Sequence, residues 1–399
     1  MRRNLLLPIV AVLAWLAPGA AAQAQDATTL TTQLSGTMRG ASSASGVFVR
    51  DLDTGTVLFD SRSRVGRIPA SVEKLYTTSA LWLKLGPTAR LQTRVLGRGT
   101  RVPEDPVWRG DLYLQGGGDP SLSTTGLTRL ARQIADAGIT RVTGRVIGDE
   151  SFFDTARGGP RTGLAYDSDI GGVLGGLTVG RGWSRKGGPA AAAARRFAAA
   201  LKTQGVSVRR SAVRVAPTPA GAPLLAQLSS PTVAQLTRST LVPSDNFYAE
   251  TLLKSLGATA GAGGTTAAGA AVAREELAGI GIRPVIADGS GLSRSNRTSP
   301  RQVVGLLGAL HAMPIGPAFE SSMALVGRSG TVSHRMRGTA AHGTCRAKTG
   351  TLRDASALAG ICTTAGGTIG FAILMNSTSV WRARSIQDRM VATLASFTG

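Results

Sequence analysis

Residues 69–74 read Pro69-Ala70-Ser71-Val72-Glu73-Lys74 and open an apolar run that is closed by Gly86-Pro87. This pattern predicts a helix over 72–85 with Ser71 at its start. Lys74 then lies one turn after Ser71 on the same face, so its amine can reach the hydroxyl. A serine hydroxyl needs such a base to become a nucleophile. Taken alone, the motif also fits a helix N-cap followed by a surface lysine.

Two further short motifs follow along the chain. Ser244-Asp245-Asn246 precedes a predicted helix over 247–256, and Lys348-Thr349-Gly350-Thr351 lies at the end of a predicted strand. Singly, the first fits a helix cap and the second a strand terminus. The chain has only six lysines and four asparagines, yet two of these lysines and one of these asparagines fall within the three motifs. This usage favours a shared role for the three motifs over three unrelated caps and termini.

This ordered set resembles the penicillin-recognising serine enzymes, in which the three motifs line one cleft. A long insertion and four further segments narrow the resemblance to the class C low-molecular-mass penicillin-binding proteins, the D-alanyl-D-alanine carboxypeptidase/endopeptidase group. The four segments are residues 117–122, 148–154, 246–250 and 288–293. The resemblance covers most of the mature chain. It implies a serine peptidase that acts on peptidoglycan stem peptides and is inhibited covalently by β-lactams such as penicillin.

The resemblance also implies a fold of the mixed α/β (α+β) class. We expect a transpeptidase-like antiparallel sheet flanked by helices, a helical subdomain and an inserted, mostly-β domain. Sequence patterns agree, because a hairpin over 46–60 and three strands with a final helix over 347–396 frame the motifs. We therefore predict an inserted domain over 91–221 within a split catalytic domain of 25–90 and 222–399.

The resemblance further implies a role for each motif residue in catalysis. Ser71 attacks the carbonyl of the penultimate D-alanine and forms an acyl-enzyme, while Lys74 takes the hydroxyl proton. Ser244 relays a proton to the leaving amine, and Lys348 lowers the pKa of Lys74.

The remaining motif residues are expected to hold the substrate. Asn246 binds its amide side, and Lys348, Thr349 and Thr351 bind its terminal carboxylate. The backbone N–H groups of Ser71 and Thr351 form the oxyanion hole. The Asp/Gly/Ser cluster at 288–293 is expected to be a structural turn beside the cleft.

The chain has two cysteines, Cys345 and Cys362. An antiparallel hairpin centred on Arg353-Asp354 places them directly opposite each other. We therefore expect a disulfide, with two buried thiols as the alternative.

The N-terminus reads as a secretory signal. Residues 1–24 contain Arg2-Arg3, an apolar stretch and a small-residue site that ends at Ala24. We expect an exported protein of the periplasm or cell wall, with an uncleaved anchor helix as the alternative. The net charge of +22 suits contact with anionic wall polymers, although a general arginine bias explains it equally well.

Other functional classes fit the sequence less well. A β-lactamase or related serine esterase of the same fold would share the acylation step, but no Glu-x-x-Leu-Asn segment is present and position 244 is Ser rather than Tyr. A non-catalytic basic wall-binding protein would not need the intact motifs. We expect no metal or other cofactor, because the three histidines form no His-Glu-x-x-His site. Nucleic-acid binding is not expected of an exported chain without an aromatic-interleaved basic patch.

Overall fold

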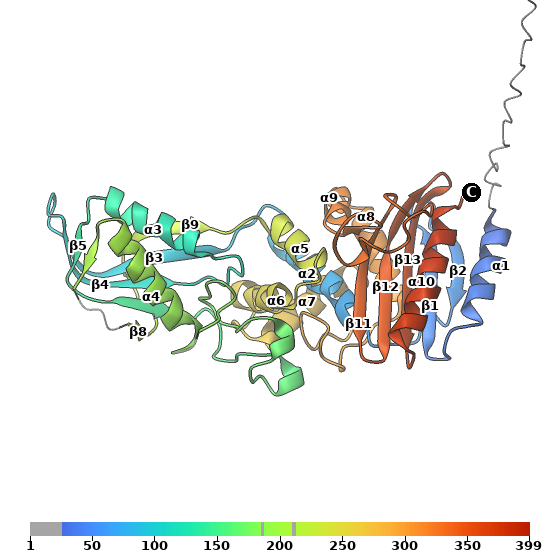
Figure 1. Ribbon diagram of the computed structural model, residues 1–399, viewed down its shortest axis with the longest axis horizontal. Helices are drawn as coiled ribbons and strands as arrows, with labels where there is room; N and C mark the ends of the chain where they lie inside the picture. Colours follow the sequence, from blue (N-terminus) through green and yellow to red (C-terminus); the bar gives the residue numbers. More distant parts are fainter. Residues whose placement is uncertain (1–25, 185–186, 210–212) are drawn as a thin grey trace, which may run out of the picture.

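The computed structural model describes residues 26–184, 187–209 and 213–399. The signal peptide predicted for residues 1–24 lies outside this range. Within the described residues no helix is long and apolar enough to cross a membrane. Figure 1 shows an elongated molecule in which a sheet lies toward each end and a group of helices lies between them.

One sheet combines the two ends of the chain in the order β10–β11–β12–β13–β1–β2. Its pairings are antiparallel, and β1 lies beside β13 with Val47 opposite Ile373. The strands are β1 (Ser45–Asp51), β2 (Val57–Ser61), β10 (Ala324–Leu325), β11 (Cys345–Leu352), β12 (Ala355–Thr364) and β13 (Gly367–Asn376). The predicted hairpin and the predicted three-strand meander are therefore confirmed and lie in one sheet.

Helices cover both faces of this sheet because successive strand residues point to opposite sides. Helices α1 (Ala27–Met38) and α10 (Val380–Ala395) bury one apolar face, as the right side of Figure 1 shows. The other face packs against the central helices. These are α2 (Glu73–Leu85), α5 (Val233–Leu241), α6 (Asn246–Ala260), α7 (Thr266–Gly279), α8 (Pro300–His311) and α9 (Gly316–Ser321).

The starts of α2 and α6 determine where the motifs lie. The 3₁₀ turn η1 (Ala70–Val72) precedes α2, so Ser71 lies just before the helix and Lys74 in its first turn. The predicted end is confirmed, since Gly86 follows Leu85 with φ +82°. Asp245 caps α6 by accepting from the N–H of Tyr248.

The middle of the chain forms a second sheet of order β7–β5–β4–β3–β9, with β6 paired to β4 and β8 paired to β6. Helices α3 (Thr124–Asp136) and α4 (Gly188–Thr203) pack on it, and the long loop between β6 and α4 contains η2 (Pro160–Thr162) and η3 (Ser168–Ile170). The strands are β3 (Gln92–Thr100), β4 (Val107–Gln115), β5 (Arg141–Val142), β6 (Val146–Asp149), β7 (Ser207–Val208), β8 (Arg214–Val215) and β9 (Leu224–Ser229).

The chain enters and leaves this second sheet at neighbouring points. The N–H of Ser230 donates to the carbonyl of Leu91 at 2.8 Å, and Ser229 pairs with Gln92. Strand β9 lies beyond residue 221, where we placed the end of the insert, and still pairs with β3. The domain limits remain a prediction, and this pairing extends the second sheet to Ser229.

Candidate active site

The three motifs meet where α2 and α6 begin, beside β11. The Nζ atom of Lys74 lies 2.8 Å from Oγ of Ser71 and 2.6 Å from Oδ1 of Asn246. The Nζ atom of Lys348, on β11, donates to Oγ of Ser244 at 2.7 Å. Residues separated by as many as 277 positions along the chain therefore meet in one place.

Lys74 is fully buried and is surrounded by acceptors. Besides Ser71 and Asn246, its amine contacts the main-chain carbonyl of Ser290 at 2.6 Å. Amide and carbonyl oxygens only accept, so Asn246 and Ser290 each take one N–H of the amine. In the neutral amine the remaining tetrahedral position is the lone pair, and it points at the hydroxyl of Ser71. This geometry suits proton abstraction from Ser71.

Burial lowers the pKa of Lys74 to about 8, while nearby carboxylates, led by Asp288 and Glu250, oppose this shift. The resemblance implied Lys348 as the cause. Loss of hydration is the leading cause, because an ammonium group is disfavoured in a buried site, and the contribution of Lys348 stays a prediction. The pKa of Lys348 is itself lowered well below its usual value, by burial and then by the charge of Lys74. The state in which both amines are protonated is therefore unfavourable.

The hydroxyl of Ser244 forms its hydrogen bond with Lys348 and not with Ser71 or Lys74. In the described residues the Ser244 hydroxyl is bonded to Lys348, whose Nζ also donates to the carbonyl of Thr349 at 2.7 Å. Ser244 has φ +63° and Ala70, before the nucleophile, has φ +47°. Such left-handed backbone is unfavourable for residues other than glycine and concentrates at functional sites.

Two glycines allow the backbone segments to approach the nucleophile. A Cβ on Gly350 would lie 2.5 Å from the carbonyl oxygen of Pro69 and 3.0 Å from the nitrogen of Ser71. A Cβ on Gly291 would lie 2.0 Å from the carbonyl oxygen of Ala70. The third motif thus passes directly beside the Ser71 main chain, which is where an oxyanion hole between Ser71 and Thr351 has to form.

The predicted carboxylate-binding hydroxyls lie at the same end of β11. The hydroxyl of Thr349 donates to Oγ1 of Thr331 at 2.7 Å. The hydroxyl of Thr351 accepts from Nη2 of Arg384 at 3.3 Å. Arg384, on α10, was not identified from the sequence, because its helix is predictable while its packing against the end of β11 is a tertiary contact.

Buried carboxyl groups lie behind Lys74. Oε1 of Glu250 accepts from the N–H groups of Gly289 and Ser290 at 3.1 and 2.8 Å. Burial and the charge of Asp288 raise the pKa of Glu250 to about 7. Both oxygens of Glu73 are buried without a hydrogen-bond partner in the described residues, and burial, Asp288 and Glu250 raise its pKa well above the usual value.

The segment at 288–293 is a turn, as expected, and it also contacts the base. Asp288 accepts from the N–H groups of Gly291 and Ser293, while the carbonyl of Ser290 accepts from Lys74. The role of Glu250 was missed, although the sequence held a signal for it. Glu250 lies four residues after Asn246, which places both on one face of α6.

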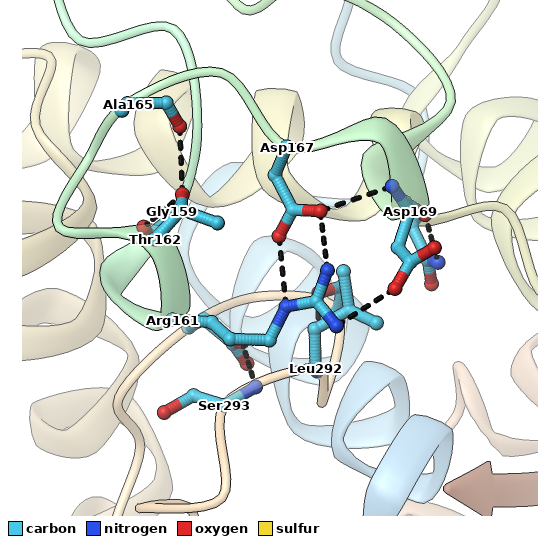
Figure 2. A network of polar contacts seen from close by, with 11 residues as sticks. Gly159, Arg161, Thr162, Ala165, Asp167, Asp169, Leu292 and Ser293 are labelled. Atoms are coloured by element: carbon cyan, nitrogen blue, oxygen red, sulfur yellow. Dashed lines mark hydrogen bonds and ion pairs between the residues drawn. The ribbon is translucent and has the colours of Figure 1, made fainter.

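A loop of the inserted part also reaches the cleft, which nothing in the sequence indicated. The carbonyl of Asp169 accepts from Nδ2 of Asn246 at 2.7 Å. Figure 2 shows this loop, with the guanidinium of Arg161 between Asp167 and Asp169 and close to the segment of Leu292.

The predicted hairpin register and its disulfide are both present. Cys345 on β11 lies opposite Cys362 on β12, and a disulfide joins them. The bond lies on the sheet face that packs against α1 and α10, within a fully buried apolar cluster. Lys348, three residues later on the same strand, points to the opposite face, toward the cleft.

A cavity of about 490 Å³ lies elsewhere, at the junction of the second sheet with the far ends of α2 and α6. Its lining includes Leu85, Arg94 and Thr259 and none of the motif residues. Because the chemistry-bearing side chains lie at the starts of these helices, we place the active site at the motif cleft and not at this cavity.

Comparison with known proteins gives one consistent result. Residues 30–167 and 179–397 match the model of a family described as D-Ala-D-Ala carboxypeptidase 3 (S13). A D-alanyl-D-alanine carboxypeptidase from Actinomadura sp. is 30% identical over 89% of this chain and 82% of its own length. Carboxypeptidase DacB from Mycolicibacterium smegmatis is 31% identical over 87% of this chain and 79% of its own length.

The fold has a counterpart among solved structures. Penicillin-binding protein 4 from Haemophilus influenzae superposes with a TM-score of 0.75 at 20% identity, covering 90% of this chain and 97% of that structure. That protein has also been solved in complex with a β-lactam.

Proposed function

The chain belongs to the D-Ala-D-Ala carboxypeptidase 3 (S13) family, and from this premise we propose that Ser71 carries out serine D-alanyl-D-alanine carboxypeptidase chemistry on peptidoglycan stem peptides. One observation supports the catalytic roles assigned to Ser71 and Lys74. The hydroxyl of Ser71 lies 2.8 Å from the buried amine of Lys74, whose pKa burial lowers to about 8. A base with a pKa near the working pH is the arrangement that general-base catalysis requires.

Acylation begins at Ser71. Its Oγ bonds to the carbonyl carbon of the penultimate D-alanine, while the hydroxyl proton passes to the lone pair of Lys74. The backbone N–H groups of Ser71 and Thr351 then stabilise the oxyanion, and one such donor is typically worth about 3–4 kcal/mol. The place of Gly350 beside Ser71 supports this role.

The leaving group takes its proton from the second amine–hydroxyl pair. The C–N bond to the terminal D-alanine breaks, and its nitrogen receives the hydroxyl proton of Ser244. The proton that Lys74 took from Ser71 replaces it, while Lys348, whose Nζ lies 2.7 Å from Oγ of Ser244, keeps the number of protons it began with. Water then hydrolyses the ester bond to Ser71, which releases the shortened peptide and restores the hydroxyl.

The substrate is held by the remaining motif residues. We infer that Lys348, Thr349 and Thr351 bind the terminal carboxylate, since all three lie on β11, the strand whose Gly350 passes beside Ser71. Arg384 adds a positive charge at Thr351. Asn246 binds the amide side of the substrate. A β-lactam presents an amide carbonyl and a carboxylate in the same relation, so it acylates Ser71 as a covalent inhibitor.

The test of this function is labelling of the mature protein with a fluorescent penicillin. We expect wild type to be labelled, Ser71→Ala to lose the label completely, and Ser207→Ala, which changes an exposed serine of the second sheet, to be labelled normally. Labelling of Ser71→Ala at the wild-type rate would contradict the proposed nucleophile.

A second measurement separates carboxypeptidase from endopeptidase activity. The protein is incubated with a pentapeptide and with cross-linked muropeptides, and the products are followed by mass spectrometry. Loss of one D-alanine from the pentapeptide indicates carboxypeptidase activity, and cleavage of the cross-link indicates endopeptidase activity. Release of neither product by wild type, while Ser71→Ala is equally inactive, would contradict the proposed activity.

We also propose that the protein is exported by the signal at residues 1–24 and that its basic surface contacts anionic wall polymers. The net charge of +22 supports this electrostatic contact. The mass of the mature protein recovered outside the cytoplasm tests cleavage after Ala24. Retention on isolated walls should fall with added salt, because salt screens exposed charges. Unchanged retention would contradict the electrostatic contact.

A further inference from the structure

Asn246 is held at both ends of its side-chain amide. Its Oδ1 accepts from Lys74 at 2.6 Å, and its Nδ2 donates to the main-chain carbonyl of Asp169 at 2.7 Å. The two partners have opposite requirements, since one presents an N–H and the other presents only an oxygen. Rotating the amide by half a turn would lose both hydrogen bonds and bring two oxygens together. The carbonyl of Asp169 therefore selects one orientation of Asn246.

This orientation matters for the base. With its oxygen toward Lys74, Asn246 accepts a hydrogen bond from the amine, and the lone pair of Lys74 stays directed at Ser71. With its nitrogen toward Lys74, the amide would donate to that lone pair and compete with the hydroxyl of Ser71 for it. The wrong orientation would thus occupy the base that acylation requires.

The carbonyl of Asp169 is placed by a small ionic cluster around Arg161. The Nε of Arg161 donates to Asp167 at 2.9 Å, a second nitrogen pairs with the other oxygen of Asp167, and Nη1 lies 2.7 Å from Oδ2 of Asp169. Asp167 in turn accepts from the N–H of Asp169 at 3.0 Å and begins η3. Figure 2 shows Arg161 joining the carboxylates of Asp167 and Asp169. A forked guanidinium on one carboxylate gives directional as well as electrostatic restraint.

We propose that Arg161 is a positioning residue for acylation: by holding Asp167 and Asp169 together, it fixes the Asp169 carbonyl on Asn246 and keeps the amide oxygen of Asn246 toward Lys74. The inserted part of the chain then helps to position a side chain of the active site. This inference rests on the proposed function, since it concerns the efficiency of the same base.

The loop has other attachments, so loss of Arg161 should leave the protein folded. Ile170 and Leu174 pack with Phe247 in a buried apolar cluster. Arg181 forms an ion pair with Asp245 at the start of α6. The side chain of Arg161 is 35% exposed and that of Asp167 is 2% exposed, so Arg161→Ala leaves a buried carboxylate that still accepts from the N–H of Asp169.

The experiment compares Arg161→Ala with Arg161→Lys and with the matched control Arg109→Ala. Arg109 lies on β4 in the inserted part and also pairs with an aspartate, Asp105, and none of its hydrogen bonds or ion pairs among the described residues involves a motif residue. The acylation rate with fluorescent penicillin is measured per titrated active site, so that any misfolded fraction does not enter the rate. We expect Arg161→Ala to slow acylation by about tenfold, within the range of coupling between contacting residues. Arg161→Lys should recover part of this loss, and Arg109→Ala should match wild type.

A double-mutant cycle tests the route through the amide. In an Asn246→Ala background, Arg161→Ala should cause no further loss of rate, because the group that Arg161 orients is gone.

Two results would overturn the inference. One is an equal acylation rate for Arg161→Ala and Arg109→Ala, and the other is a full additional loss of rate when Arg161→Ala is added to Asn246→Ala. If Arg161→Ala fails to fold, Arg161→Lys decides, since a wild-type rate per active site overturns the inference and a reduced rate supports it. Absence of labelling in wild type would instead overturn the proposed function.

Discussion

Gly291 and Ala70 approach each other so closely that a Cβ on Gly291 would lie 2.0 Å from the carbonyl oxygen of Ala70. Gly291 belongs to the turn whose Ser290 carbonyl accepts from Lys74, and Ala70 immediately precedes Ser71. One backbone contact thus sets the position of the base relative to the nucleophile.

We predict that Gly291→Ala slows acylation and destabilises the fold. Gly281→Ala is the matched control, because the φ of +78° at Gly281 is similar to the φ of +85° at Gly291, but a Cβ on Gly281 would meet no atom of the described residues within 4 Å. The control should cost about 1 kcal/mol of unfolding free energy through its backbone conformation alone. The overlap at Gly291 should add roughly 1–3 kcal/mol. Urea unfolding and the acylation rate measure both effects, and equal behaviour of the two variants would contradict the proposed packing.

The pH dependence of acylation should follow Lys74. Because the amine accepts a proton only when neutral, the rate with penicillin should rise with pH and reach half its plateau near the pKa of about 8. Lys74→Ala should be almost inactive across this range. Lys84→Ala is the control. Lys84 lies at the other end of α2 from Lys74 and pairs with Glu276 of α7, so this variant should keep the wild-type dependence of rate on pH. A rate that is flat between pH 6 and about 9 would contradict the role of Lys74.

Glu250 should make stability depend on pH. Its pKa is about 7 in the folded protein against 4.5 for an unperturbed glutamate, so the folded state keeps a proton that the unfolded chain releases. The free energy of unfolding contributed by this group is therefore greatest below about pH 4.5 and decreases as pH rises through 7.

Glu250→Gln should remove this slope, because glutamine does not titrate and can still accept from Gly289 and Ser290. We expect the variant to gain stability relative to wild type between pH 5 and about 8, by an amount on the order of a few kcal/mol. Urea unfolding at several pH values measures the difference, with the exposed Glu275→Gln as control. A constant difference across this range would show that the carboxyl of Glu250 does not titrate there.

The disulfide should stabilise the hairpin that carries the third motif. The bond closes a sequence separation of 17 residues, for which chain entropy predicts about 3 kcal/mol. Cys345→Ala with Cys362→Ala should lower the free energy of unfolding by this order, and a reducing agent should then have no further effect. Alkylation of denatured wild type without reductant should label no thiol, and two labelled thiols would show that the bond is absent.

Much of the local structure was predictable from the sequence, because it depends on neighbouring residues. Gly86 ends α2 with a φ of +82°, and Asp245 caps α6 within the motif that was expected to precede that helix. The opposition of Cys345 and Cys362 followed from the centre of one hairpin. The second sheet was predicted less well, since β9 lies beyond residue 221 and its pairing with β3 joins distant segments.

By itself the sequence determined the candidate chemistry: the serine proposed as nucleophile, the lysine one turn from it, and the two other motifs that accompany them. These are matters of residue type and short spacing, and helical periodicity alone brings Ser71 and Lys74 together. Tertiary structure decided how that chemistry is tuned. Burial is the leading cause of the lowered pKa of Lys74, and the carbonyl of Asp169 contacts Asn246 from another part of the chain. Desolvation and through-space contacts depend on how remote segments pack, which the order of residues along the chain does not express.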